Sequence, residues 1–111
     1  KIPAFLAPYK VAVLPLLKKD GLPEKALEVV RKIKFDHMVQ YDEKDAIGKR
    51  YRRQDAIGTP LCVTVDHQTL EDQTVTVRFR DTMEQIRISI DELAPLVNEK
   101  VSLGQQLYKI S

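Results

Sequence analysis

YKVAVLPLL, at residues 9–17, is the segment around which the rest of the chain can be arranged. It is apolar and rich in β-branched residues without clean alternation, which is typical of a strand buried on both faces. Asp20 and Gly21 interrupt this pattern, and Pro23 suits the first turn of a helix whose apolar residues recur at helical spacing to about Lys34. The segment therefore predicts a central strand followed by an amphipathic crossover helix.

The alternation of strands and helices continues beyond this unit. The sequence predicts a short strand at residues 38–41, a basic helix at about residues 46–56 that Gly58 closes, and a second buried strand at residues 60–66. A polar segment, HQTLED at residues 67–72, follows. The order strand, helix, strand, helix, strand indicates parallel pairing of these three strands.

The next two strands show strict alternation. TVTVRFR, at residues 74–80, directs its valines and phenylalanine to one face and its threonines and arginines to the other. EQIRISI, at residues 84–90, alternates again with its isoleucines inward, so the two strands predict an antiparallel hairpin before a last helix. The predicted fold class is α/β, with a mixed sheet of five strands in which the fourth runs against the first three.

Composition limits the possible functions. A length of 111 residues suits one domain, and the net charge of +2 means that binding to a polyanion must come from local clusters of cations. No apolar run approaches the roughly 20 residues that cross a bilayer, and KIPAFLAPYK at the start does not resemble a signal peptide. Because the chain begins with Lys1, we expect a piece of a longer protein.

The side chains that could hold a metal or act as nucleophiles are few. Cys62 is the single cysteine, which excludes an internal disulfide and suits a reducing compartment, and we expect it to fill the core. His37 and His67 lack metal-ligand spacing, so no metal site is expected. The sequence has no GxSxG, GxGxxG or GxxxxGK motif. We predict that this chain is not catalytic by itself.

One octet, IGKRYRRQ at residues 47–54, concentrates positive charge and contains no acid. On a helix its cations would fan over about half of the surface and leave Ile47 and Tyr51 on the other side. These cations are Lys49, Arg50, Arg52 and Arg53. Two interpretations stay open: a surface for RNA or another polyanion, or a solvated helix whose cations pair with nearby acids. Those acids are Asp42, Glu43, Asp45 and Asp55.

The hairpin offers a second candidate surface. Arg78 and Arg80 project from one sheet face, and their planar donors suit phosphate oxygens or a guanine edge. Glu71, just before this strand, could accept from the amino group of cytosine or guanine. Together with the basic helix they predict a platform for single-stranded RNA. The alternative is that both arginines pair across the hairpin with Glu84 or Asp81.

A longer resemblance joins these segments. IGKRYRRQDAIGTPLCVTVDHQTLEDQTVTVRFRDTMEQIRISIDEL, at residues 47–93, resembles the C-terminal anticodon-binding domain of the homodimeric class II glycyl-tRNA synthetases, and so does APYKVAVLPLLKKDGLPEKA at residues 7–26. The resemblance spans about residues 7–97. It implies an anticodon-binding domain at residues 1–100, a tail of uncertain structure at residues 101–111, and a three-layer α/β/α fold with strand order 2-1-3-4-5.

The same resemblance implies a function. The domain would hold the anticodon arm of tRNA(Gly) while a separate catalytic domain, absent from this chain, joins glycine to the tRNA. ATP and magnesium would belong to that catalytic domain, and no cofactor is expected in this one. The parent enzyme would be a cytoplasmic homodimer, and this fragment a monomer, because dimerisation in this class normally belongs to the catalytic domain.

The resemblance also suggests which residues contact RNA. Related threonyl-type domains use a glutamate before strand 4 and an arginine near its end, which by position correspond to Glu71 and Arg80. Face and charge add further candidates, namely Arg78, Asp81, Lys49, Arg50 and Arg53. Two alternatives remain: the same fold reused for protein and nucleic-acid contacts, as in the accessory subunit of the mitochondrial DNA polymerase, or the anticodon domain of a threonyl, prolyl or histidyl synthetase.

Overall fold

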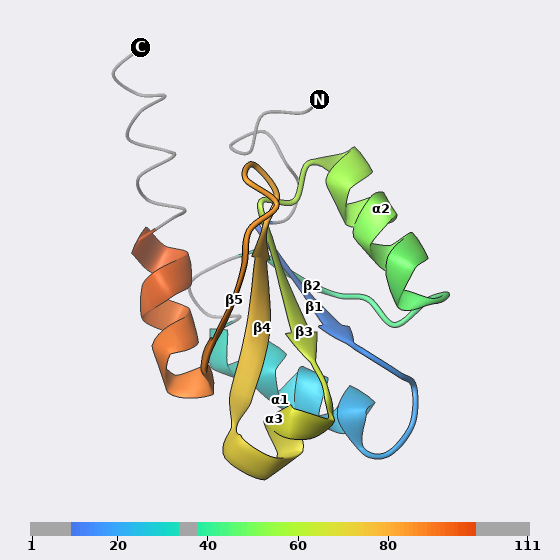
Figure 1. Ribbon diagram of the computed structural model, residues 1–111, viewed down its shortest axis with the longest axis vertical. Coiled ribbons are helices and arrows are strands. Elements are labelled where there is room, and N and C mark those ends of the chain that lie inside the picture. Colours follow the sequence, from blue (N-terminus) through green and yellow to red (C-terminus); the bar gives the residue numbers. More distant parts are fainter. Residues whose placement is uncertain (1–9, 34–37, 100–111) are drawn as a thin grey trace.

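The sheet is built around strand β1 (Val11–Pro15), whose residues are all buried. The computed structural model describes residues 10–33 and 38–99. β1 pairs in parallel with β2 (Val39–Tyr41) on one side and with β3 (Leu61–Val65) on the other. β4 (Thr74–Phe79) is antiparallel to β3, and β5 (Gln85–Ser89) is antiparallel to β4. The strand order β2-β1-β3-β4-β5 confirms the expected mixed sheet with an antiparallel fourth strand (Figure 1).

Helices lie on both faces of this sheet and give three layers (Figure 1). α1 (Leu22–Ile33) and the helix at residues 90–99 pack against one face, where their apolar side chains join those of the strands. α2 (Ile47–Ile57) packs against the other face. It lies one residue from the expected bounds of 46–56. The predicted three-layer α/β/α architecture is therefore confirmed.

The two faces of the sheet bury different amounts of apolar surface. Alternate residues of β1, β3 and β4 face α1 and form the main core, because successive side chains of a strand point to opposite faces. The strand residues of this core are Val11, Val13, Leu61, Val63, Val65, Val75 and Val77. The face toward α2 buries a smaller cluster of Ala12, Leu14 and Cys62, and Ile47 and Tyr51 pack against it. The main core thus holds the sheet together, while α2 rests on the smaller cluster.

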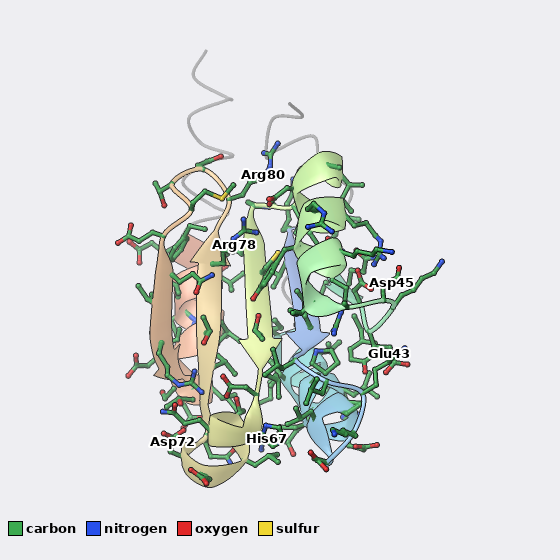
Figure 2. All side chains as sticks on the ribbon, turned by 45° about the vertical axis from the view of Figure 1, so that its right-hand side comes forward. Glu43, Asp45, His67, Asp72, Arg78 and Arg80 are labelled. Atoms are coloured by element: carbon green, nitrogen blue, oxygen red, sulfur yellow. The ribbon has the colours of Figure 1, made fainter. Side chains whose placement is uncertain are left out.

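Part of the α2 face of the sheet is left open. α2 lies over β1 and β3, and in the described part of the chain no helix covers β4 and β5 on this side (Figure 2). We call this surface the open half of the sheet. Its residues are Thr74, Thr76, Arg78, Gln85, Arg87 and Ser89. These polar side chains make the open half a candidate for binding a polar partner.

The short helix between β3 and β4 was not predicted from the sequence. The polar segment at residues 67–72 forms a short helix, α3 (His67–Asp72), at the turn from β3 to β4. A capping box begins it: the Asp66 carboxylate accepts from the Thr69 amide at 3.1 Å, and the Thr69 hydroxyl accepts from the Asp66 amide at 3.0 Å. The expected tail at residues 101–111 lies outside the described residues. Among the residues described, no helix is long and apolar enough to cross a membrane.

Candidate nucleic-acid interface

Arg50 is turned inward, toward the sheet. Only 2% of it is exposed, and its guanidinium donates to three backbone carbonyls. Nη1 donates to the Pro15 oxygen and, at 3.3 Å, to the Asp42 oxygen, and Nη2 donates to the Leu16 oxygen at 3.1 Å. Burial lowers the pKa of Arg50. The expectation that all four cations of α2 share an exposed face is therefore wrong for Arg50, which joins the ends of β1 and β2.

Arg53 is neutralised by two acids from the loop before α2. Its Nη1 lies 2.6 Å from Asp42 Oδ2, and its Nη2 lies 2.7 Å from Asp45 Oδ2. Burial favours a higher pKa for Asp42, but hydrogen bonds from Arg53 and Gln54 outweigh it and hold this pKa below its usual value. For Arg53 the structure supports the interpretation as a locally paired cation.

Arg78 is fixed between the sheet and α2 by three side chains. Its guanidinium makes a two-point pair with Asp55, at 3.3 Å and 3.2 Å, and lies 4.8 Å from the centre of the Tyr51 ring. Its Nη2 is also 3.0 Å from Met83 Sδ. The Tyr51 hydroxyl in turn bonds to Thr64 Oγ1. The alternative partners across the hairpin, Glu84 and Asp81, are thus wrong for Arg78, which pairs with a carboxylate on α2.

Arg80 and Glu71 lie at opposite ends of β4. Arg80 follows the last residue of the strand, is 5% exposed, and donates its amide to the Pro60 oxygen at 2.9 Å. Glu71 lies on α3, before the strand begins, and is exposed. At a rise of about 3.3 Å per residue, β4 separates them by roughly 20 Å. The two side chains therefore cannot contact the same base, and an RNA that met both would have to extend along the strand.

Three other residues of the two candidate surfaces are exposed. Asp81 lies in the β4–β5 turn, at the Arg80 end of the sheet. Lys49 and Arg52 lie on the outer surface of α2, and neither has an ion pair with any residue in the described ranges. Arg52 belongs to the basic octet but is absent from the candidates chosen on face and charge. Arg52 is exposed because of the way α2 is rotated about its axis, and this rotation cannot be read from the number of charges in the octet.

Arg87 is a further residue of the open half that the sequence analysis did not single out. Its Nε donates to Thr74 Oγ1 at 2.8 Å and its Nη1 to Thr76 Oγ1 at 2.9 Å, while Nη2 lies 2.6 Å from Asp66 Oδ1. Burial favours a higher pKa for Asp66, but hydrogen bonds from Arg87 and Thr69 outweigh it and lower this pKa. The sequence did contain a signal for Arg87, because it alternates with the inward isoleucines of EQIRISI and so points outward. Arg87 ties β3, β4 and β5 together across the open half.

The described residues offer little for covalent or metal chemistry. Cys62 is buried, and burial raises its pKa to about 12, so it is not a nucleophile at neutral pH. His67 Nε2 lies 2.9 Å from Asp20 Oδ2 at an exposed position on the opposite end of the sheet from Arg80 (Figure 2). In the described ranges no group of three or more histidines, cysteines or acids could hold a metal ion.

Comparison with known proteins relates the chain to one family. The model of the anticodon binding domain family matches residues 10–100. The chain is 56% identical over 96 residues to a glycine–tRNA ligase of Borrelia hermsii, covering 86% of this chain and 22% of that protein. It is 58% identical over 96 residues to a glycine–tRNA ligase of Clostridium tetani, covering 86% of this chain and 20% of that protein. The chain thus spans about a fifth of the length of these curated relatives.

A solved structure supports the fold independently of close sequence similarity. A prolyl-tRNA synthetase from Cryptosporidium parvum superposes with a TM-score of 0.80 over 95% of this chain and 23% of that chain, at 24% identity. The strand order and the two helical layers described above therefore occur in a second protein. From the matched residues, 10–100, and from this shared fold, we conclude that the chain belongs to the anticodon binding domain family.

Proposed function

We propose that this chain is the anticodon-recognition module of a glycine–tRNA ligase and holds the anticodon arm of tRNA(Gly). The observation that carries the proposal is the match to the anticodon binding domain family, together with 56% and 58% identity to two glycine–tRNA ligases. Residues 1–100 would form this module. A catalytic domain outside the chain would bind ATP and magnesium and join glycine to the tRNA.

The open half of the sheet supplies the surface for this role. It is polar, it lies beside a helix with two exposed cations, and Arg78 places its guanidinium over the Tyr51 ring, 4.8 Å from the ring centre. Single-stranded RNA loops are recognised by hydrogen bonds to splayed bases and by stacking on planar groups. We therefore place the anticodon loop on the open half, near Arg78.

The proposed contacts differ in their roles. Glu71, Arg78, Arg80 and Asp81 are proposed to discriminate bases, since carboxylates and guanidinium groups can pair with base edges. Lys49 is proposed to contact phosphate. Arg50 and Arg53 are left out, because the Arg50 guanidinium is bonded to three backbone carbonyls and the Arg53 guanidinium to two aspartates. Arg78 is kept because it has one carboxylate partner and lies on the open half, and Arg80 is kept on the family resemblance, although it is 5% exposed. A loop that met both Glu71 and Arg80 would lie along the length of β4.

The proposal extends to the surroundings of the domain. We place the parent enzyme in the cytoplasm as a homodimer whose subunits join through their catalytic domains, so this chain by itself would be a monomer. Identity favours a glycine enzyme over a prolyl one, since the prolyl-tRNA synthetase structure is 24% identical. Sedimentation at micromolar concentrations would contradict the monomer if the apparent mass rose with concentration.

RNA titration tests the proposed function. We would titrate the chain with a hairpin that carries a glycine anticodon, and with the same hairpin in which the two glycine-defining bases are changed. A pairing contact with a base is worth about 1 to 3 kcal/mol, so the glycine hairpin should bind at least about fivefold more tightly. Equal affinity for the two hairpins would contradict base recognition within this chain.

A further inference from the structure

The exposed side of α2 forms a continuous stripe. Residues 48, 49, 52 and 56 are the exposed positions of this helix. At about 100° per residue they fall within roughly 100° of one another, on the side away from Ile47 and Tyr51. We call Gly48, Lys49, Arg52 and Ala56 the outer stripe of α2.

The stripe carries the positive charge of α2 that local acids do not offset. Arg50 is buried, and Arg53 contacts two carboxylates. Lys49 and Arg52 are exposed, and within residues 10–33 and 38–99 neither forms an ion pair. Two like charges on adjacent turns repel each other unless an anion lies near them. The folded chain therefore presents two cations that an anionic partner would stabilise.

The small residues of the stripe keep its cations accessible. A Cβ atom added to Gly48 would lie 3.8 Å from Arg52 Nη1, so the guanidinium extends back along the helix over this glycine. Ala56, on the next turn, adds only a methyl group. A polymer backbone can thus come close to α2 at this place, where a guanidinium and an ammonium offer donors suited to phosphate oxygens.

The stripe also lies beside the surface proposed for the anticodon loop. Arg52 and Asp55 are neighbours at i and i+3, and Asp55 reaches across to Arg78 on β4. Arg52 and Arg78 therefore lie on neighbouring parts of the surface, with Asp55 between them.

We propose that Lys49 and Arg52 form a phosphate-binding edge that holds the backbone of the anticodon arm without reading its sequence. This inference rests on the proposed function for the identity of the RNA. It adds Arg52 to the contacts and assigns the two stripe cations to affinity, leaving discrimination to the residues around Arg78.

The test compares two double variants that remove the same charges from exposed helix positions. Lys49→Gln with Arg52→Gln removes the stripe cations, and Arg31→Gln with Lys32→Gln removes an arginine and a lysine from α1, on the opposite face of the sheet. Each chain is titrated with the glycine hairpin and with the base-changed hairpin at several salt concentrations. Urea unfolding checks that both variants remain folded.

The proposal predicts a change in the salt dependence of the stripe variant alone. Loss of two phosphate contacts should make the slope of log affinity against log salt shallower by about 1.4. If the stripe variant and the unsubstituted chain bind equally near 1 M salt, this change corresponds to about 25-fold weaker binding by the variant at about 0.1 M salt. The loss should be the same for both hairpins. An unchanged slope, or equal changes in the two variants, would overturn the phosphate-binding edge.

The two proposals fail in different ways. If the unsubstituted chain binds both hairpins equally, the proposed anticodon recognition is overturned, while the slopes of the variants still decide the role of the stripe. If the unsubstituted chain binds neither hairpin at low salt, both proposals are overturned.

Discussion

Asp55 on α2 and Arg78 on β4 form a two-point ion pair, with Nη1–Oδ1 and Nη2–Oδ2 distances of 3.3 Å and 3.2 Å. The pair is partly exposed, since 15% of the Arg78 side chain and 28% of the Asp55 side chain are accessible. It holds the guanidinium at the edge of the open half of the sheet. Asp55 therefore sets both the position of Arg78 and how much of its charge a ligand can use.

Asp55→Asn should change how the chain selects RNA. Without the carboxylate, the charge of Arg78 is less compensated and its guanidinium is held less firmly. Binding to both hairpins should therefore tighten at low salt, while the preference for the glycine hairpin should narrow. Asp45→Asn is the matched control, because it removes the same charge from an aspartate that pairs with Arg53 instead. If both variants kept the same preference as the unsubstituted chain, Arg78 would not be a base contact.

Arg50→Met should destabilise the fold by about 3 kcal/mol, because it leaves three carbonyls around a buried position without their donor. Arg52→Met removes the same type of side chain from an exposed position two residues away, and should change the free energy of unfolding by less than about 0.5 kcal/mol. Urea unfolding followed by circular dichroism measures both. Similar values for the two variants would contradict the role assigned to Arg50.

The stability of the fold should fall in acid. In the folded chain the pKa values of Asp42 and Asp66 lie below the ordinary value of 3.8. The unfolded chain therefore binds more protons than the folded chain at low pH. The stability that these two carboxylates contribute is fully present above the pKa of the unfolded chain. It is lost as the pH falls below that value and then through the lower pKa values of the folded chain. Thermal unfolding between pH 6 and about pH 2.5 should show this loss.

A substitution tests whether these carboxylates are responsible. Asp66→Asn should lower the melting temperature at neutral pH and make its decline in acid shallower, since the pair with Arg87 is already lost. Asp81→Asn changes an exposed aspartate in the β4–β5 turn and should leave the acid profile unchanged. A profile for Asp66→Asn parallel to that of the unsubstituted chain would exclude Asp66 as a source of the pH dependence.

Cys62 should be unreactive until the chain unfolds. It is 3% exposed and burial raises its pKa to about 12, so little thiolate is present or accessible at pH 8. A disulfide reagent that releases a coloured thiolate should react with the native chain only slowly and with the chain in guanidinium at once. Ala56→Cys places a second thiol on the exposed side of α2 and should react immediately. Fast labelling of Cys62 in the native chain would show that α2 lifts from the sheet.

Much of the fold follows from patterns that are local in the sequence. The buried strand at Val11–Pro15 follows from an unbroken apolar run, and the hairpin follows from strict alternation of apolar and polar residues. The helix at His67–Asp72 is not, because it is short and polar and depends on one capping box. Strand order depends on contacts between distant segments, and it was expected only through the family resemblance.

The candidate site shows the limit of counting charges. Lys49, Arg50, Arg52 and Arg53 look equivalent in the octet, yet only Lys49 and Arg52 face solvent with no carboxylate partner among the residues that the structure describes. A signal for Arg50 was present, since residues 47, 50, 51 and 54 follow the i, i+3, i+4, i+7 spacing of one helix face. Asp42 and Asp45, which pair with Arg53, were among the acids expected to pair with the octet, but the cation that they contact depends on how the loop before α2 folds.

The inward Arg50 also fills space at the carboxyl ends of β1 and β2. In open α/β sheets, small cofactors bind at the carboxyl ends of the parallel strands, where the strand order reverses. Here the strand order reverses between β1 and β3, and the carboxyl ends of β1 and its other neighbour, β2, meet the Arg50 guanidinium, which is bonded to the carbonyls of Pro15, Leu16 and Asp42. A nucleotide-sized compound would have to expel a buried cation to enter. An RNA bound as proposed would spread over the outer surface and leave Arg50 in place, so a fold that holds small cofactors in other proteins would here support a large ligand.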